Sequence, residues 1–499
     1  NPTSPIYLTA SRNSIYDNVF ELGLIDMVES RIEGEITLDN SITNFNFTTT
    51  PILGNDCYVH ENLLQQLQSN DDNINYEVLN FDSTEVDENG NLSFRYDYDS
   101  YREKLTIYEY KNDNNWKEID EIYFNDDDEK NKTIELGNLV GLYEGNLVYL
   151  QRNPKTGFNE ILQAEPGANK KSVLATLENI EIVSVLKNSV NGNVIGYQSL
   201  DNVYRSHYFD PITQDYYNNA AKYFDNQNFY FSSFSTNYEK AIIFAFGVNN
   251  PGAYFLYDNN SSSTKLLNYP YPRLVPSLLA TGKTIVYTTR DNQKITAYLL
   301  LPADYDPNQE YPLILMPHGG PHARDYLGYD EFSQFIASQG YIVVKPNFRG
   351  STGYGKGFEE AGYKGWGGVM QDDLEDLISF LENQKYVVQN NVCIVGQSYG
   401  GYAALMGVVK TPSLYKCAVS INGVSHLPDQ VKHLLSKFDN EKNQILIHNT
   451  IGHPKKDKAM LEFNSPALNA NKIKAPILLI AGEDDRVVPY RQSKIMSRA

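Results

Sequence analysis

The sequence predicts a chain of two structural classes: an all-β region over residues 1–275 and an α/β region with a doubly wound, mostly parallel sheet over residues 276–499. Two observations lead to this prediction. Before about residue 275, short alternating runs rich in Tyr and Phe are separated by turn residues, and helical periodicity is scarce. After Gly282, apolar strand-like runs alternate with segments of helical periodicity. The change of period marks the boundary between the two predicted domains.

Four hairpins are expected in the first region, with turns centred near Asn112, Pro154, Pro211 and Asn259. These centres lie about 40 to 60 residues apart, which is the interval expected of four-stranded propeller blades. We therefore expect a β-propeller that is incomplete at its N-terminus. A pair of β-sandwiches is the alternative interpretation.

The second region is expected to start with a hairpin around Asp291 and Asn292. Continuous apolar runs then predict buried strands, and 3.6-residue periodicity predicts helices between them. The predicted strands lie within 311–320, which ends in a glycine turn, 341–350, 392–395 and 476–480, and the predicted helices at 332–340, closed by Gly340, 371–384, 401–409 and 490–499. This alternation is typical of a doubly wound sheet with helices on both faces.

A serine lies between a predicted strand and a predicted helix, in the sequence Gly396-Gln397-Ser398-Tyr399-Gly400. Small residues on both sides let the strand and the helix approach each other closely, which exposes the serine hydroxyl on a tight turn. A structural glycine turn is the alternative. We interpret Ser398 as the nucleophile of an acyl-transfer enzyme.

A serine hydroxyl needs a histidine to accept its proton and a carboxylate to orient that histidine. In a doubly wound hydrolase the chain order is serine, acid, histidine, and the acid follows a later buried strand. The strand at 476–480 is followed by Glu483, Asp484 and Asp485. We choose Asp485 because it closes the turn before the run of two valines and a proline. Asp484 is the second choice, and Glu483 is interpreted as a solvated turn residue.

The oxyanion of an acyl-transfer reaction needs two N–H donors. The residue after the nucleophile, Tyr399, supplies one, and the glycine-rich loop after an early strand supplies the other, which we assign to Gly319. His318 and His322 belong to this loop and precede the serine, so neither is expected to be the base.

Five motifs occur in one order along the C-terminal region: HGGP (318–321), NFRGSTGYGKGF (347–358), WGG (366–368), GQSYGGYAAL (396–405) and APILLIAGEDDRVVP (475–489). On these motifs the segment from about Gly282 to the end resembles the catalytic domain of the prolyl oligopeptidase family of serine peptidases. It is most similar to the acylaminoacyl peptidase and dipeptidyl peptidase branch. The N-terminal half is similar to this family's propeller only in general character.

The resemblance implies an α/β-hydrolase fold preceded by a β-propeller. It implies a serine exopeptidase or oligopeptidase that cleaves short peptides through a Ser-His-Asp acyl-enzyme mechanism, with the propeller limiting access. It places the nucleophile at Ser398, the acid at Asp485 and the oxyanion donors at Gly319 and Tyr399. No cofactor is implied.

One departure from the family concerns the histidine, which there follows the acid. Here 14 residues follow Asp485 and none is a histidine. We therefore expect both ends of the chain to be truncated, with the catalytic histidine beyond residue 499 and the region 276–499 lacking its C-terminal end. Two alternatives stay open: a carboxylesterase of the same fold, and a non-catalytic protein if the chain truly ends at residue 499.

Arg349, in the NFRG motif, has two interpretations of equal weight. It could bind a carboxylate or carbonyl group of the substrate, or it could be a structural partner of a buried carboxylate.

Composition limits the partners. Hydrophobic residues make up 41% and charged residues 21%, and 42 basic against 62 acidic residues give a net charge of −20. This charge argues against nucleic acids and anionic membranes, and the apolar runs are too short to cross a bilayer. Cys57, Cys393 and Cys417 form no metal-binding pattern and are expected to be buried free thiols. Short peptides are the expected partners of a soluble protein, cytoplasmic or periplasmic, and a homo-oligomer stays open.

Overall fold

The computed structural model describes residues 84–86, 92–99, 104–111, 115–123 and 138–499, apart from 166–167, 169, 189–192, 225–226, 236–238 and 439–440. The chain divides into two compact units, residues 1–54 and 55–499, and every described residue lies in the second. Cys57, the turn near Asn112 and the predicted start of the all-β region lie outside the described residues. In the described part of the chain, no helix has the length and hydropathy needed to cross a membrane.

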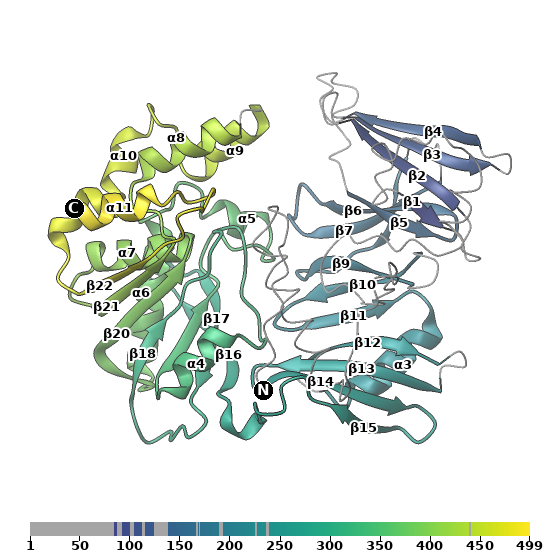
Figure 1. Ribbon diagram of the computed structural model, residues 1–499, viewed down its shortest axis with the longest axis horizontal. Helices are drawn as coiled ribbons and strands as arrows, with labels where there is room; N and C mark the ends of the chain where they lie inside the picture. The colour runs from purple at the N-terminus through teal and green to yellow at the C-terminus, as the bar shows by residue number, and fades with distance from the viewer. Residues whose placement is uncertain are drawn as a thin grey trace, which may run out of the picture. The chain divides into compact units, whose positions relative to one another are not determined.

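Four antiparallel sheets follow one another along the N-terminal part of this unit (Figure 1). Each is built from strands consecutive in sequence. Three sheets have four strands and one has three: β1 (Thr84–Val86), β2 (Leu92–Asp99), β3 (Lys104–Lys111) and β4 (Asn115–Tyr123); β5 (Asn138–Tyr143), β6 (Asn146–Arg152), β7 (Asn159–Ala164) and β8 (Ser172–Ala175); β9 (Glu181–Lys187), β10 (Val194–Leu200) and β11 (Tyr204–Tyr208); β12 (Asn228–Phe234), β13 (Lys240–Gly247), β14 (Asn250–Asp258) and β15 (Ser263–Asn268).

Three of the four predicted hairpins are confirmed by antiparallel pairing: β3 with β4, β6 with β7, and β14 with β15. In these three segments, turn residues between runs of alternating apolar residues correctly predict a hairpin. The closure of the four sheets into a propeller stays a prediction, as does the domain boundary at residues 275 and 276.

The hairpin predicted around Pro211 is wrong. The residues after β11 form a helix, α3 (Pro211–Ala221). Asp210 caps it by accepting a hydrogen bond from the backbone N–H of Thr213 at 2.7 Å, and a proline in the first helical turn has a suitable fixed φ. Tyr217 lies buried on one face of the helix and stacks on Phe229 at 4.5 Å between ring centroids. The Asp-Pro pair was a helix-start signal that the hairpin interpretation missed.

The C-terminal region contains one seven-stranded sheet, as the alternating pattern predicts. Its strands run in the order β16-β17-β19-β18-β20-β21-β22. β16 pairs antiparallel with β17 and β17 antiparallel with β19, whereas all later pairs are parallel. The strands are β16 (Thr281–Thr288), β17 (Lys294–Leu301), β18 (Tyr311–Leu315), β19 (Ile342–Pro346), β20 (Val387–Gln397), β21 (Tyr415–Ile421) and β22 (Ile477–Ile480).

Helices pack on both faces of this sheet. Leu299 and Leu300, neighbours on β17, point into two different cores, because side chains alternate along a strand. One core receives α6 and α7, and the other receives Ala337 of α4. The helices are α4 (Glu331–Ser338), α5 (Lys356–Glu360), α6 (Val369–Asn383), α7 (Tyr399–Lys410), α8 (Leu427–Lys437), α9 (Glu441–Thr450), α10 (Lys458–Phe463) and α11 (Arg491–Arg498), with 3₁₀ turns η2 (Pro276–Leu278) and η3 (Pro466–Lys472).

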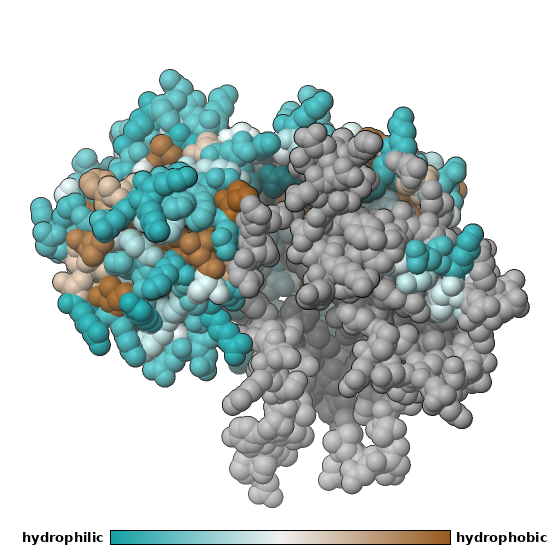
Figure 2. Space-filling view, turned by 90° about the horizontal axis from the view of Figure 1, so that it is seen from above, coloured by the Kyte–Doolittle hydropathy of each residue, from teal (hydrophilic) through white to brown (hydrophobic). Residues whose placement is uncertain are grey.

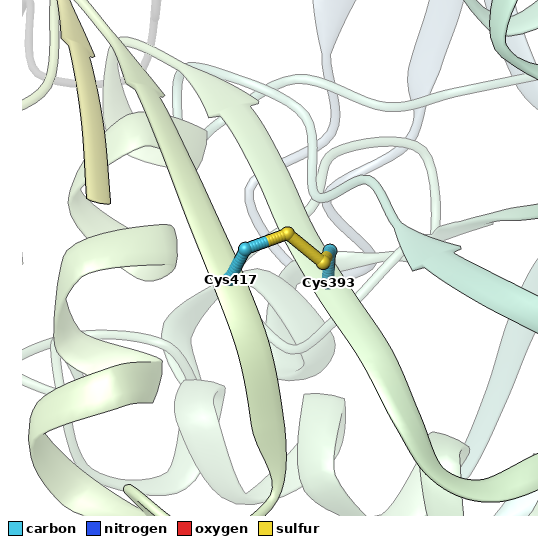
Figure 3. Close-up of a disulfide and its surroundings, with 2 residues drawn as sticks. All are labelled: Cys393 and Cys417. Atoms are coloured by element: carbon cyan, nitrogen blue, oxygen red, sulfur yellow. A yellow bond between two sulfur atoms is a disulfide. The ribbon is translucent and has the colours of Figure 1, made fainter. Parts of the chain in front are cut away.

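Two cysteines are joined, which corrects the prediction of free thiols. Cys393 on β20 and Cys417 on β21 form a disulfide (Figure 3). They are paired residues of adjacent parallel strands, with Cα atoms 4.7 Å apart. The sequence could not show this proximity, because the two positions are 24 apart in the chain, with helix α7 between them.

The surface agrees with the acidic, polar composition. In the view of Figure 2, the described surface is mostly hydrophilic, and hydrophobic residues occur as small separate patches. Single exposed apolar side chains of this kind are ordinary in folded proteins.

Candidate functional site

Ser398 occupies the sharp turn between β20 and α7. Its backbone has φ +57° and ψ −118°, a conformation that is strained for a residue with a Cβ atom. The turn is held on both sides: the Ser398 N–H donates to the carbonyl of Ile421 at 2.9 Å, and its carbonyl accepts from the N–H of Tyr402 at 3.0 Å. The structure therefore presents this serine on a strained strand-to-helix elbow, as the motif predicts.

Two glycines make this elbow sterically feasible. A Cβ atom on Gly396 would lie 2.4 Å from the carbonyl carbon of Gly400, and a Cβ atom on Gly400 would lie 2.1 Å from the carbonyl oxygen of Pro317. Real side chains do not tolerate such distances, so only glycine lets the strand, the helix and the loop after β18 meet here.

Gly319, one of the two residues assigned to the oxyanion site, lies beside the serine. A Cβ atom built on it would be 3.5 Å from the Cβ atom of Ser398. Tyr399 is the first residue of α7, where backbone N–H groups have no partner within the helix. The structure thus brings the predicted donors and the predicted nucleophile together. Their donation to an oxyanion stays a prediction.

His318 is engaged by the protein through both ring nitrogens. Nδ1 donates to the carbonyl of Gly319 at 2.7 Å, since a carbonyl can only accept, and Nε2 lies 2.9 Å from the hydroxyl of Ser351. Burial lowers the pKa of His318 and favours the neutral ring. The ring also stacks on Phe348 at 4.4 Å. This histidine supports the shape of the Gly319 loop.

Asp485 follows β22, the outermost parallel strand. Its Oδ1 accepts from the N–H groups of Val487 and Val488 at 2.8 and 2.9 Å. No hydrogen bond to its other oxygen, Oδ2, is found among the described residues. Glu483 and Asp484 are exposed, whereas Asp485 is half-buried. The choice of Asp485 over its neighbours therefore has a structural rationale, and its catalytic role stays a prediction.

The register of the sheet relates the serine to the acid. Gln397, at the end of β20, pairs with Ile421 of β21, and Ile421 pairs with Ile480 at the end of β22. Because these strands are parallel, Ser398 and the turn that carries Asp485 both follow the carboxyl edge of the sheet, which is where open α/β sheets bind ligands.

Arg349 is surrounded by the protein's own carboxylates. Its Nε lies 3.0 Å from both carboxylate oxygens of Asp373, its backbone N–H donates to the same carboxylate at 2.9 Å, and its Nη1 is paired with Asp291. Arg349 is 7% exposed and Asp373 is fully buried. Of its two interpretations, these contacts favour the structural one. Contact with a substrate stays an untested prediction.

Asp373, the buried partner of Arg349, was not predicted from the sequence. It lies on α6, in a run that was interpreted only as an amphipathic helix. A signal was present, because Asp373 occupies the apolar face of that helix with Leu374 and Leu377, and a buried carboxylate requires a partner.

The sequence similarity to known protein families lies in the C-terminal part of the chain. Residues 328–499 match the profile described as the prolyl oligopeptidase family. The dipeptidyl aminopeptidase BIII of Pseudoxanthomonas mexicana is 36% identical over 257 residues, which are 50% of this chain and 37% of that protein. The acylamino-acid-releasing enzyme of Rattus norvegicus is 25% identical over 214 residues, 41% of this chain and 28% of that enzyme. The chain thus spans well under half the length of these relatives.

Solved structures extend the similarity over most of the chain. A puromycin-hydrolyzing peptidase of Mycobacterium tuberculosis has a TM-score of 0.60 at 18% identity, covering 83% of this chain and 63% of that one. The acylaminoacyl peptidase of Pyrococcus horikoshii has a TM-score of 0.58 at 17% identity, covering 83% and 61%. At this identity the similarity shows the fold. Residues 328–499 thus resemble the prolyl oligopeptidase family in sequence, and most of the chain resembles these two solved peptidases in fold.

Proposed function

We propose that this protein is a serine peptidase that hydrolyses peptide bonds of short peptides through an acyl-enzyme. The observation that carries the proposal is the backbone of Ser398 at φ +57°, between β20 and α7, with Gly319 so near that a Cβ atom on it would lie 3.5 Å from the Ser398 Cβ atom. Strain of this kind persists only where the surrounding structure over-determines it, and such positions cluster at active sites.

The proposed chemistry begins with attack of the Ser398 hydroxyl oxygen on the substrate carbonyl carbon, while its proton passes to a histidine. The carbonyl oxygen becomes an oxyanion and accepts hydrogen bonds from the N–H groups of Gly319 and Tyr399. The histidine then gives the proton to the leaving amine, and a water molecule hydrolyses the acyl-enzyme by the same steps in reverse roles.

In this scheme Asp485 orients the histidine. Its Oδ1 is fixed by two backbone N–H groups, so Oδ2 is the oxygen that would accept from the imidazole. The family resemblance assigns the base to a histidine after the acid, and the printed sequence has none there. The complete coding sequence tests this part of the proposal, since a histidine downstream of Asp485 supports it and its absence removes the base.

Substrate size is proposed to be limited by the N-terminal sheets, arranged as a propeller over the catalytic region. Direct contacts between the two regions support this arrangement. Arg152 at the end of β6 forms an ion pair with Glu359 of α5, and Asn228 of β12 donates to the carbonyl of Leu327 at 2.7 Å. The names of the relatives, a dipeptidyl aminopeptidase and an acylamino-acid-releasing enzyme, suggest short peptides as the substrate class.

The test uses the natural full-length protein. A fluorophosphonate should label the wild type and should fail to label Ser398→Ala, because the oxygen that displaces fluoride from phosphorus is missing. Wild-type protein that has not been treated with the probe should cleave dipeptidyl or N-acetylaminoacyl amides as well as simple esters. Turnover of esters alone would identify a carboxylesterase, and absence of labelling would identify a non-catalytic protein.

A further inference from the structure

The turn that carries Asp485 has little support of its own. It follows β22, a strand of four residues at the end of the described sheet, and its residues Asp484, Arg486 and Val487 are exposed. Within the described residues, the Asp485 carboxylate accepts hydrogen bonds only from the N–H groups of Val487 and Val488. The position of that carboxylate therefore depends on where the backbone of these two valines is held.

Gln430, on helix α8, holds this backbone from the side of the core. Its Nε2 donates to the carbonyl oxygen of Val487 at 2.8 Å. This carbonyl and the N–H of Val488, which donates to the Asp485 carboxylate, belong to the same peptide group, so one peptide group separates Gln430 from the acid. The Gln430 side chain is only 3% exposed, and a carbonyl partner fixes which end of its amide faces the turn.

Helix α8 is itself firmly placed. Its residues Leu427 and Val431 are fully buried in the core of the catalytic region. The backbone N–H of Leu427 donates to the hydroxyl of Ser465 at 2.9 Å, and the ring of His426 caps the helix by accepting from the N–H of Asp429 at 3.1 Å. A side chain that projects from this helix and binds the turn can therefore hold the turn in a fixed position.

Other contacts between α8 and the turn are more exposed. His433 Nε2 donates to the carbonyl of Arg486 at 2.9 Å, and beyond the turn Asp429 forms an ion pair with Arg491, the first residue of α11, at 3.0 Å. The Arg491 side chain is 70% exposed, and ion pairs at such positions contribute little because water screens them. The buried amide of Gln430 is thus the contact expected to dominate.

We infer that Gln430 is a positioning residue for the reaction, which holds the Asp485 carboxylate in register with the rest of the catalytic machinery through the backbone of Val487. This inference rests on the proposed function, because it presumes that Asp485 is the catalytic acid. A shift of a catalytic group by about 1 Å is enough to lower a rate by about a hundredfold.

The test compares Gln430→Met with Gln334→Met in the full-length protein. Methionine is close to glutamine in volume and removes only the amide. Gln334 is a matched control, since it is also buried and its Nε2 donates to backbone carbonyls, of Val248 and Ala280, away from the acid turn. Gln430→Met should lower kcat by about tenfold or more with KM changed less than about twofold. Gln334→Met should leave kcat unchanged even if it lowers Tm.

A double-mutant cycle separates positioning from general stability. The rate of fluorophosphonate labelling of Ser398 is measured for the wild type, Gln430→Met alone, Asp485→Asn alone, and both together. If Gln430 acts through Asp485, the glutamine substitution should slow labelling in the wild-type background and change its rate less than about twofold in the Asp485→Asn background. Equal effects in both backgrounds, or equal losses of kcat in the two glutamine variants, would overturn the inference.

Two further measurements keep the outcome interpretable. Thermal unfolding shows whether Gln430→Met is folded at the assay temperature. If it is not, Gln430→Asn, which keeps the amide but is too short to reach Val487, takes its place in the cycle with the same expectations. Labelling of Ser398→Ala, or wild-type activity in Asp485→Asn, would contradict the proposed function itself. If the enzyme needs Ser398 and Asp485 but the glutamine variants are labelled by the fluorophosphonate at the normal rate, only the role of Gln430 is contradicted.

Discussion

Replacing Arg349 by methionine should destabilise the catalytic region strongly. The substitution leaves Asp373, which has no exposed surface, without its guanidinium partner, and Arg349 itself is only 7% exposed. Removing one member of a buried ion pair costs about 3 to 5 kcal/mol, because a charge stays buried without compensation. For a domain of this size, a loss of about 3 kcal/mol corresponds to a fall in Tm of about 6 to 12 °C.

The loss should depend on pH with a defined sign. Burial raises the pKa of Asp373 to about 6, against the hydrogen bonds from Arg349, which lower it. Without Arg349 the pKa of Asp373 should rise further. A carboxyl whose pKa is higher in the folded state binds protons more tightly there, so the free energy of unfolding falls as pH rises from the unfolded-state pKa to the folded-state pKa. The variant should therefore differ most from the wild type at about pH 8 and least near pH 5.

Thermal or urea unfolding of the full-length protein at these two pH values measures the effect. Arg290→Met is a control, because Arg290 pairs with Asp372 and Asp376 but its side chain is 50% exposed, and such pairs contribute about 0 to 1 kcal/mol. An Arg349→Met variant that unfolds like the wild type but has a raised KM would refute the structural argument and restore the substrate-binding interpretation.

Three further predictions concern the elbow, the acid and the disulfide. Ser398→Ala should abolish activity and labelling without lowering Tm, and Ser398→Gly should have a free energy of unfolding about 1 kcal/mol higher than Ser398→Ala, measured by urea denaturation, because glycine relieves the strain at φ +57°. Asp485→Asn should lower kcat by about 10³ to 10⁴ with little change in KM, whereas Asp484→Asn should have a small effect; the reverse order would show that the wrong carboxylate was chosen. Replacing Cys393 and Cys417 together by alanine should lower the free energy of unfolding by about 3 kcal/mol, measured by urea denaturation under oxidising conditions, and equal stability would show that the bond is dispensable.

The sequence by itself predicted the order of the two structural classes along the chain and the elbow at Ser398, because both depend on local chemistry. Alternation of period 2 and period 3.6 distinguishes strands from helices wherever a segment is half-buried. The glycines around Ser398 are required by close approach of a strand and a helix that are adjacent in sequence, so the motif carries its own structural context. Where a local signal was present but overlooked, as with the Asp-Pro start of α3, the prediction was wrong.

Only the tertiary structure decided which residues far apart in the chain are in contact. The pairing of Cys393 with Cys417 depends on strand register, and the partner of Arg349 depends on how α6 packs against the loop after β19. The link from Gln430 to Val487 joins two elements 57 residues apart, and neither residue carries a motif. Such contacts are fixed by the packing of whole helices and strands, and local propensity contains no information about which distant side chains that packing will bring together.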